Sequence, residues 1–106
     1  MSKKRADRRQ AERDAVKLAR ARMKLAAAAP GGAPDRPIEV TSASTVEVHA
    51  TGLPCPACEL AGTRLEEHAA VSEGTPPRHL RVARLRCPRC GVRREVYFRI
   101  GTALPS

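Results

Sequence analysis

Apolar and polar residues alternate along three stretches in the C-terminal half of the chain. The alternation runs through residues 63–71, 79–86 and 92–100, and a Pro/Gly-containing turn at 72–77 separates the first two stretches. Alternation with a period of two places apolar side chains on one face of a strand. We therefore predict three antiparallel strands over these ranges.

A further stretch, 38–51, is rich in Val, Ile and Thr and alternates at Val46, Val48 and Ala50. This composition is typical of strands. It predicts one more strand, or two short strands broken near residues 42–44, and so a sheet of three to four antiparallel strands.

Residues 3–29 lack Gly and Pro and are rich in Ala, Arg, Lys and Leu, which predicts a helix. Its apolar face is thin, so the helix is expected to bury little surface. Three prolines and two glycines at 30–37 predict that the helix ends there and is loosely connected to the C-terminal part of the chain. The predicted organisation is a basic helical arm at 1–29, a linker at 30–37 and a β domain at 38–106.

The four cysteines of the chain form two C-x-x-C pairs, Cys55-Pro56-Ala57-Cys58 and Cys87-Pro88-Arg89-Cys90, separated by 28 residues. Two such turns can deliver four thiolates to one tetrahedral metal ion, while the intervening residues loop out and return. Four thiolates leave no open position for a catalytic water, and neither serine nor histidine stands in a nucleophile motif. We therefore expect a non-catalytic protein without a small-molecule substrate.

Paired cysteine knuckles joined by antiparallel strands resemble the zinc ribbon family, and the resemblance covers roughly the C-terminal half of the chain. It implies a small metal-stapled β fold, which the basic helix predicted above precedes in the chain. It also implies one structural Zn²⁺ per chain, held by Cys55, Cys58, Cys87 and Cys90. Zinc ribbons occur in transcription, translation and RNA-processing factors, which suggests a setting of that kind.

Rubredoxins, which hold iron in two C-P-x-C-G knuckles for electron transfer, are an alternative. The second knuckle matches that form with Gly91, but the first has Glu59 where rubredoxins have Gly. Either Glu59 adopts a positive φ, or the first knuckle has a different shape. Rubredoxins also have an aromatic core, whereas this chain has one Tyr, one Phe and no Trp. Zinc is therefore favoured over iron, and His49, His68 and His79 are expected in strands or loops rather than as ligands.

Disulfide pairing in a secreted domain is a further alternative. The N-terminus is rich in Lys and Arg, and its apolar run at 25–29 is too short for the core of a signal peptide. Nor does any stretch approach the 18 apolar residues typical of a membrane span. We expect a cytoplasmic protein without membrane contact, in a reducing compartment where paired cysteines bind metal or do redox chemistry.

Charge is distributed unevenly along the chain. The formal net charge is +9, and residues 1–29 carry +7 of it. This asymmetry suggests that the arm binds an anionic partner. The candidate phosphate contacts are the ten basic residues of the arm: Lys3, Lys4, Arg5, Arg8, Arg9, Arg13, Lys17, Arg20, Arg22 and Lys24.

A second candidate surface is an arginine-rich edge of the predicted sheet: Arg78, Arg81, Arg84, Arg86, Arg89, Arg93, Arg94 and Arg99. With only Tyr97 and Phe98 available, base stacking on a single strand is poorly supported. The expected function is a zinc ribbon that binds nucleic acid or a nucleoprotein complex through basic surfaces. The alternative is a protein-interaction module whose arm docks on an acidic protein surface, with no contact to nucleic acid.

Overall fold

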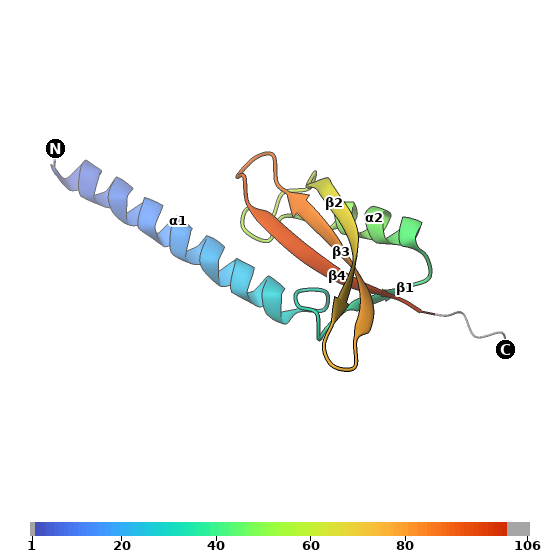
Figure 1. Cartoon of the computed structure of the whole chain (residues 1–106). Helices are drawn as coiled ribbons and strands as arrows, with labels where there is room; N and C mark the ends of the chain where they lie inside the picture. Colours follow the sequence, from blue (N-terminus) through green and yellow to red (C-terminus); the bar gives the residue numbers. More distant parts are fainter. Residues whose placement is uncertain (1, 102–106) are drawn as a thin grey trace.

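A long helix projects from a small four-stranded sheet in the computed structural model, which describes residues 2–101 (Figure 1). The helix is α1 (Ser2–Ala28), and a second helix, α2 (Ala43–Gly52), covers one face of the sheet. The strands are β1 (Ile38–Val40), β2 (Arg64–Glu73), β3 (Arg78–Arg86) and β4 (Arg93–Ile100). The predicted helix and the three strands of the C-terminal half are therefore confirmed to within two residues at each end.

Strand order in the sheet is β1-β4-β3-β2. β2, β3 and β4 form the predicted antiparallel meander, but β1 runs parallel to β4, with Ile38 opposite Phe98. The sheet is thus mixed, and the prediction of a wholly antiparallel sheet was wrong. A short turn requires antiparallel neighbours, whereas a long connection allows parallel ones. Since α2, β2 and β3 lie between β1 and β4 along the chain, no short turn joins the two strands and imposes an antiparallel direction on β1.

The predicted strand at 38–51 was wrong beyond Val40, because residues 43–52 form α2. Ser42 caps the helix, its hydroxyl accepting a hydrogen bond from the Thr45 N–H at 3.3 Å. Val46 and Ala50, four residues apart, share the buried face, while Val48 points to solvent. Burial of this face outweighs the strand preference of Val and Thr.

The main core lies between α2 and the sheet. Val46 and Ala50 of α2 pack with apolar side chains from three strands, and Ile38, Leu53 and Leu65 cover the edges. The buried strand residues are Val40, Ala83, Leu85, Val96 and Phe98. The alternation predicted for 92–100 is confirmed by the burial of Val96 and Phe98.

The segment 30–37 folds against the sheet. The Tyr97 N–H donates to the Gly31 carbonyl at 2.8 Å, and Arg36 donates to the Ala27 carbonyl at 2.9 Å, which caps the end of α1. Gly31 is buried with φ +85°, and a Cβ there would lie 2.7 Å from Ile38 Cδ1. A loose connection is therefore not what the structure shows: the segment holds the end of α1 against β4.

Candidate metal centre

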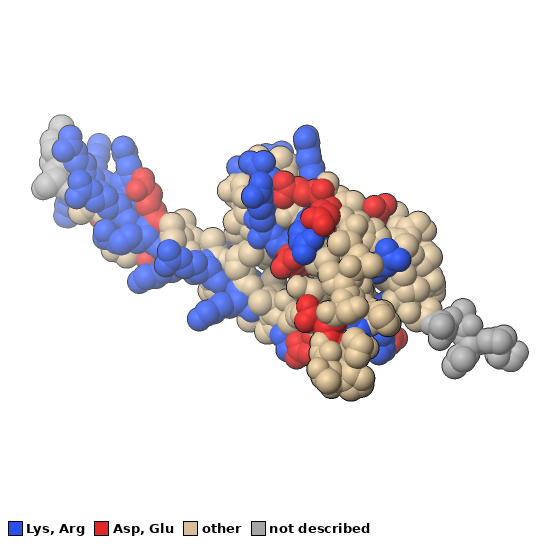
Figure 2. Space-filling view, in the orientation of Figure 1, with Lys and Arg blue, Asp and Glu red and all other residues tan. Residues whose placement is uncertain are grey.

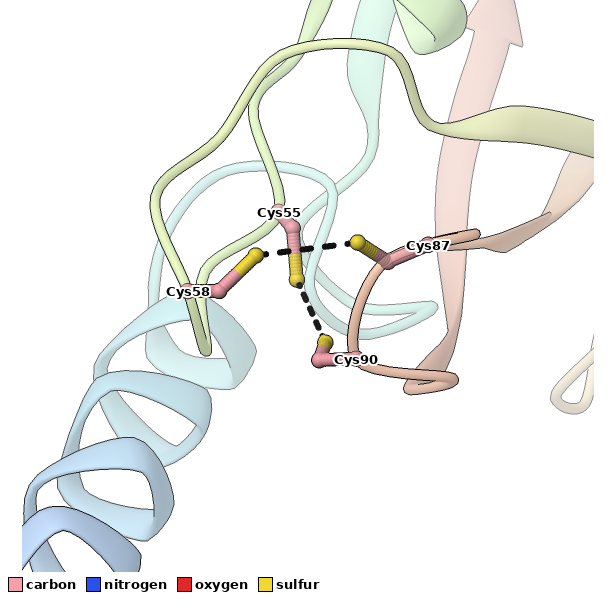
Figure 3. A group of neighbouring side chains, drawn as sticks. All are labelled: Cys55, Cys58, Cys87 and Cys90. Carbon is pink, nitrogen blue, oxygen red and sulfur yellow. Dashed lines mark hydrogen bonds between the residues drawn. The ribbon is translucent and has the colours of Figure 1, made fainter.

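The two C-x-x-C knuckles meet at one end of the sheet (Figure 3). The first lies in the loop between α2 and β2, and the second forms the turn between β3 and β4. All four Sγ atoms lie within 4.8 Å of one another. The distances are 3.6 Å from Cys55 to Cys90 and 3.6 Å from Cys58 to Cys87, well beyond the length of a disulfide bond.

Both knuckles have the same backbone geometry. The N–H of Glu59 donates to the Cys55 carbonyl at 2.7 Å, and that of Gly91 donates to the Cys87 carbonyl at 2.8 Å. Glu59 and Gly91 both have positive φ, 62° and 76° respectively. Of the two possibilities for the first knuckle, the structure has the strained one, in which a non-glycine residue occupies the left-handed region.

Backbone N–H groups also donate to the sulfurs. Hydrogen bonds from the N–H groups of Cys90 and Arg89 lower the pKa of Cys87 to about 6, although burial opposes this. The Val92 N–H favours the thiolate of Cys90, but burial and the neighbouring sulfurs together raise the pKa of Cys90 to about 12. The Leu60 N–H occupies the equivalent place at Cys58, whose pKa is nevertheless raised by burial and by Cys87 and Cys55. Four ionised thiols at this spacing therefore need a cation between them.

The sulfur positions fit a tetrahedral metal ion. A regular tetrahedron with 2.3 Å metal–sulfur bonds has sulfurs about 3.8 Å apart, close to the two 3.6 Å distances. His49 lies on α2, His68 on β2 and His79 on β3, and none of them belongs to the cluster. The four cysteines are thus positioned to bind a metal ion with thiolate ligands alone.

The C-terminal half of α1 packs against the first knuckle, which the sequence did not predict. Ala19 and Met23 contact the small cluster formed by Cys55, Ala57 and Cys87. Arg22, four residues before Ala26 and three after Ala19, extends from the same face of the helix. The only sequence signal for this contact is Glu59, a charged residue at the position where the second knuckle has Gly91.

Arg22 was predicted to contact nucleic acid, but the structure places it on the knuckle. Its Nε lies 3.0 Å from the Glu59 carboxylate, and its Nη1 donates to the Ala57 carbonyl at 3.3 Å. The other nine basic residues of the predicted set are exposed and form no ion pair within residues 2–101. Figure 2 shows Lys and Arg gathered along α1, with few acidic side chains among them.

Half of the arginine-rich edge is occupied by interactions within the sheet and its loops. Arg84 pairs with Glu95 and Glu67, each at 2.9 Å, and these contacts raise its pKa. Arg93 pairs with Glu66 and Arg99 with Glu39, while Arg94 donates to the Pro54 carbonyl. The remaining four form no ion pair among the described residues: Arg78, Arg81, Arg86 and Arg89.

Neither helix of the described part of the chain combines the length and apolar character needed to cross a membrane. No protein-family model matches the chain, and neither a curated protein nor a solved structure matches it.

Proposed function

We propose that this protein is a non-catalytic structural-zinc protein that binds nucleic acid through one face of α1. The observation that carries the proposal is a row of exposed cations without acidic partners on a helix held against a four-thiolate centre. The row, here called the cationic stripe, consists of Arg9, Arg13, Lys17, Arg20 and Lys24.

Zinc is favoured by the donors and by their surroundings. Four thiolates suit both zinc and iron, and a closed tetrahedral set is typical of structural zinc. Ala19, Met23, Ala57 and Val92 surround the sulfurs, whereas Phe98 belongs to the core beneath α2. The aromatic setting of rubredoxin iron is therefore missing from the described residues around the cluster. When bound, the ion neutralises the thiolates and joins the two knuckles.

Elemental analysis of the protein, purified from cells supplied with both zinc and iron, tests this assignment. We expect one zinc per chain in the wild type and well below one in Cys87→Ser. The control is Ala70→Ser, at an exposed position of β2, which should bind zinc as the wild type does. Stoichiometric iron, with a visible thiolate-to-iron absorption band, would contradict the zinc assignment and indicate a rubredoxin-like iron site. No stoichiometric metal in the wild type would remove the metal site altogether.

The stripe has the geometry of a phosphate-binding surface. Its members follow one another at intervals of three or four residues, so they share one face of the helix. From residue 9 to residue 24 the stripe is about 22 Å long at 1.5 Å per residue. Of the acidic residues of α1, Asp7 and Asp14 lie off this face, and Glu12 lies at its edge near Arg9 and Arg13. Ala19, Met23 and Ala26 face the ribbon, so the stripe turns away from it.

Salt-dependent binding to a generic duplex tests this part of the proposal. Replacing all five stripe residues by Gln should make the negative slope of log K against log salt shallower by about 4 to 5, because each phosphate contact contributes about −0.9. A matched control replaces the four remaining edge arginines, Arg78, Arg81, Arg86 and Arg89, by Gln. We expect that control to bind nearly as the wild type does.

The opposite result would be loss of binding only in the variant of the four edge arginines. It would indicate that nucleic acid binds to the sheet and not to α1. If the wild type does not bind duplex or single-stranded nucleic acid at moderate salt, the stripe fits an acidic protein surface instead. The protein is then an interaction module.

A further inference from the structure

Docking of α1 joins the basic arm to the metal centre through a few specific contacts. Ala19, Arg22, Met23 and Ala26 have the i, i+3, i+4, i+7 spacing of one helix face, and all four are half-buried. By contrast, residues 3–18 are exposed throughout. The helix is therefore held at its C-terminal end, by the first knuckle and by the folded segment 30–37.

Glu59 has a backbone conformation that a glycine would adopt without strain. The second knuckle has Gly91 at this position, with the same hydrogen bond and a similar φ. Strained residues persist where the surrounding structure gives them a role. Here the left-handed turn directs the Glu59 carboxylate towards Arg22, 3.0 Å away, beside the Ala57 carbonyl that Arg22 also contacts.

The first knuckle also carries two of the four sulfurs of the metal centre. Cys55 and Ala57 are buried beneath α1, and Cys58 lies next to Glu59 in the chain. A metal ion bound to Cys55 and Cys58 therefore orders the same few residues on which α1 docks. A helix with so thin an apolar face frays when it is not docked.

We propose that Arg22 and Glu59 form a latch that couples metal binding to the order of α1, so that the metal-loaded knuckle holds the basic arm in place. This rests on the metal site of the proposed function and does not require nucleic-acid binding. Because coupling is reciprocal, the docked helix must also tighten metal binding by the same factor by which metal favours docking.

Amide hydrogen exchange of residues 19–28 in the full chain, with zinc bound and after chelation, tests the latch. We expect slow exchange in the loaded wild type and fast exchange after chelation. In zinc-loaded Glu59→Gln and Arg22→Gln, exchange should quicken by about two- to fivefold, the effect of losing a partly exposed ion pair. Both variants should retain one zinc per chain but bind it more weakly in equilibrium competition with a chelator, by at most a similar factor.

Glu12→Gln is the matched control, since it makes the same change of charge on the exposed part of α1 and should change neither quantity. Glu59→Gly should retain zinc and show a similar quickening of exchange in α1, because it removes the carboxylate and also the backbone strain. Unchanged exchange in zinc-loaded Arg22→Gln would overturn the latch, and so would slow exchange of residues 19–28 in the chelated wild type. Elemental analysis of each sample separates these outcomes from a failure to bind metal at all.

Discussion

Val46 and Val48 are two residues apart in α2 and differ completely in exposure. Val46 is fully buried between α2 and the sheet, whereas the exposed fraction of Val48 is 74%. A strand would place both side chains on the same face, because its side chains alternate with a period of two. Their difference is a direct signature of the helix at this position.

Truncating each valine therefore distinguishes the helix from the predicted strand. Val46→Ala should lower the free energy of unfolding by about 2 kcal/mol, since two methyl groups leave a packed core. Val48→Ala should change it by less than about 0.5 kcal/mol, because the site is exposed and Ala favours helix. Urea denaturation of the zinc-loaded protein measures both values. Comparable losses in the two variants would contradict the helix.

At the scale of elements, α1 is one continuous helix with two different environments. Residues 3–18 are surrounded by solvent, and the part from Ala19 onwards contacts the knuckle and the folded segment 30–37. Good helix-forming residues extend over the whole length of α1, which explains the continuity of the helix.

The division of the chain into arm, linker and domain stays a prediction. Deletion of residues 1–29 would, however, uncover Ala57 and part of the metal centre, so the Gln variants are the cleaner test of the stripe.

At the scale of the whole molecule, packed apolar residues form two clusters within residues 2–101. One lies under α2, and the other surrounds the cysteines at the end of the sheet where β3 turns into β4. Seven buried residues make up the first cluster and three the second. Domains this small usually need a staple in addition to their core. A metal ion bound by the four cysteines would supply one, because it would join the α2–β2 loop to the β3–β4 turn.

Removing the metal should therefore unfold residues 38–101 as a unit. Structural zinc contributes about 10–16 kcal/mol in small peptides, which matches or exceeds the whole stability of a typical domain. Circular dichroism before and after chelation should show loss of the strand signal, and added Zn²⁺ should restore it. Persistence of that signal in the metal-free protein would mean that the core under α2 suffices for folding.

Much of the fold and of the site was predictable from local patterns. Alternation located β2, β3 and β4, the absence of Gly and Pro located α1, and the spacing of Cys55, Cys58, Cys87 and Cys90 grouped the four sulfurs. These signals are readable because each depends on residues close together in the sequence, and because a C-x-x-C turn presents two sulfurs whatever surrounds it.

Contacts between distant segments were decided only by the tertiary structure. Val46 and Ala50 form a helix because the sheet offers an apolar face for their side chains, which their own preferences do not reveal. β1 can run parallel to β4 because no short turn joins them. Arg22 resembles the other cations of α1 in the sequence, and only the docked helix brings it to Glu59. Composition and spacing specify local conformation, but the burial that selects among surfaces exists only once the chain has folded.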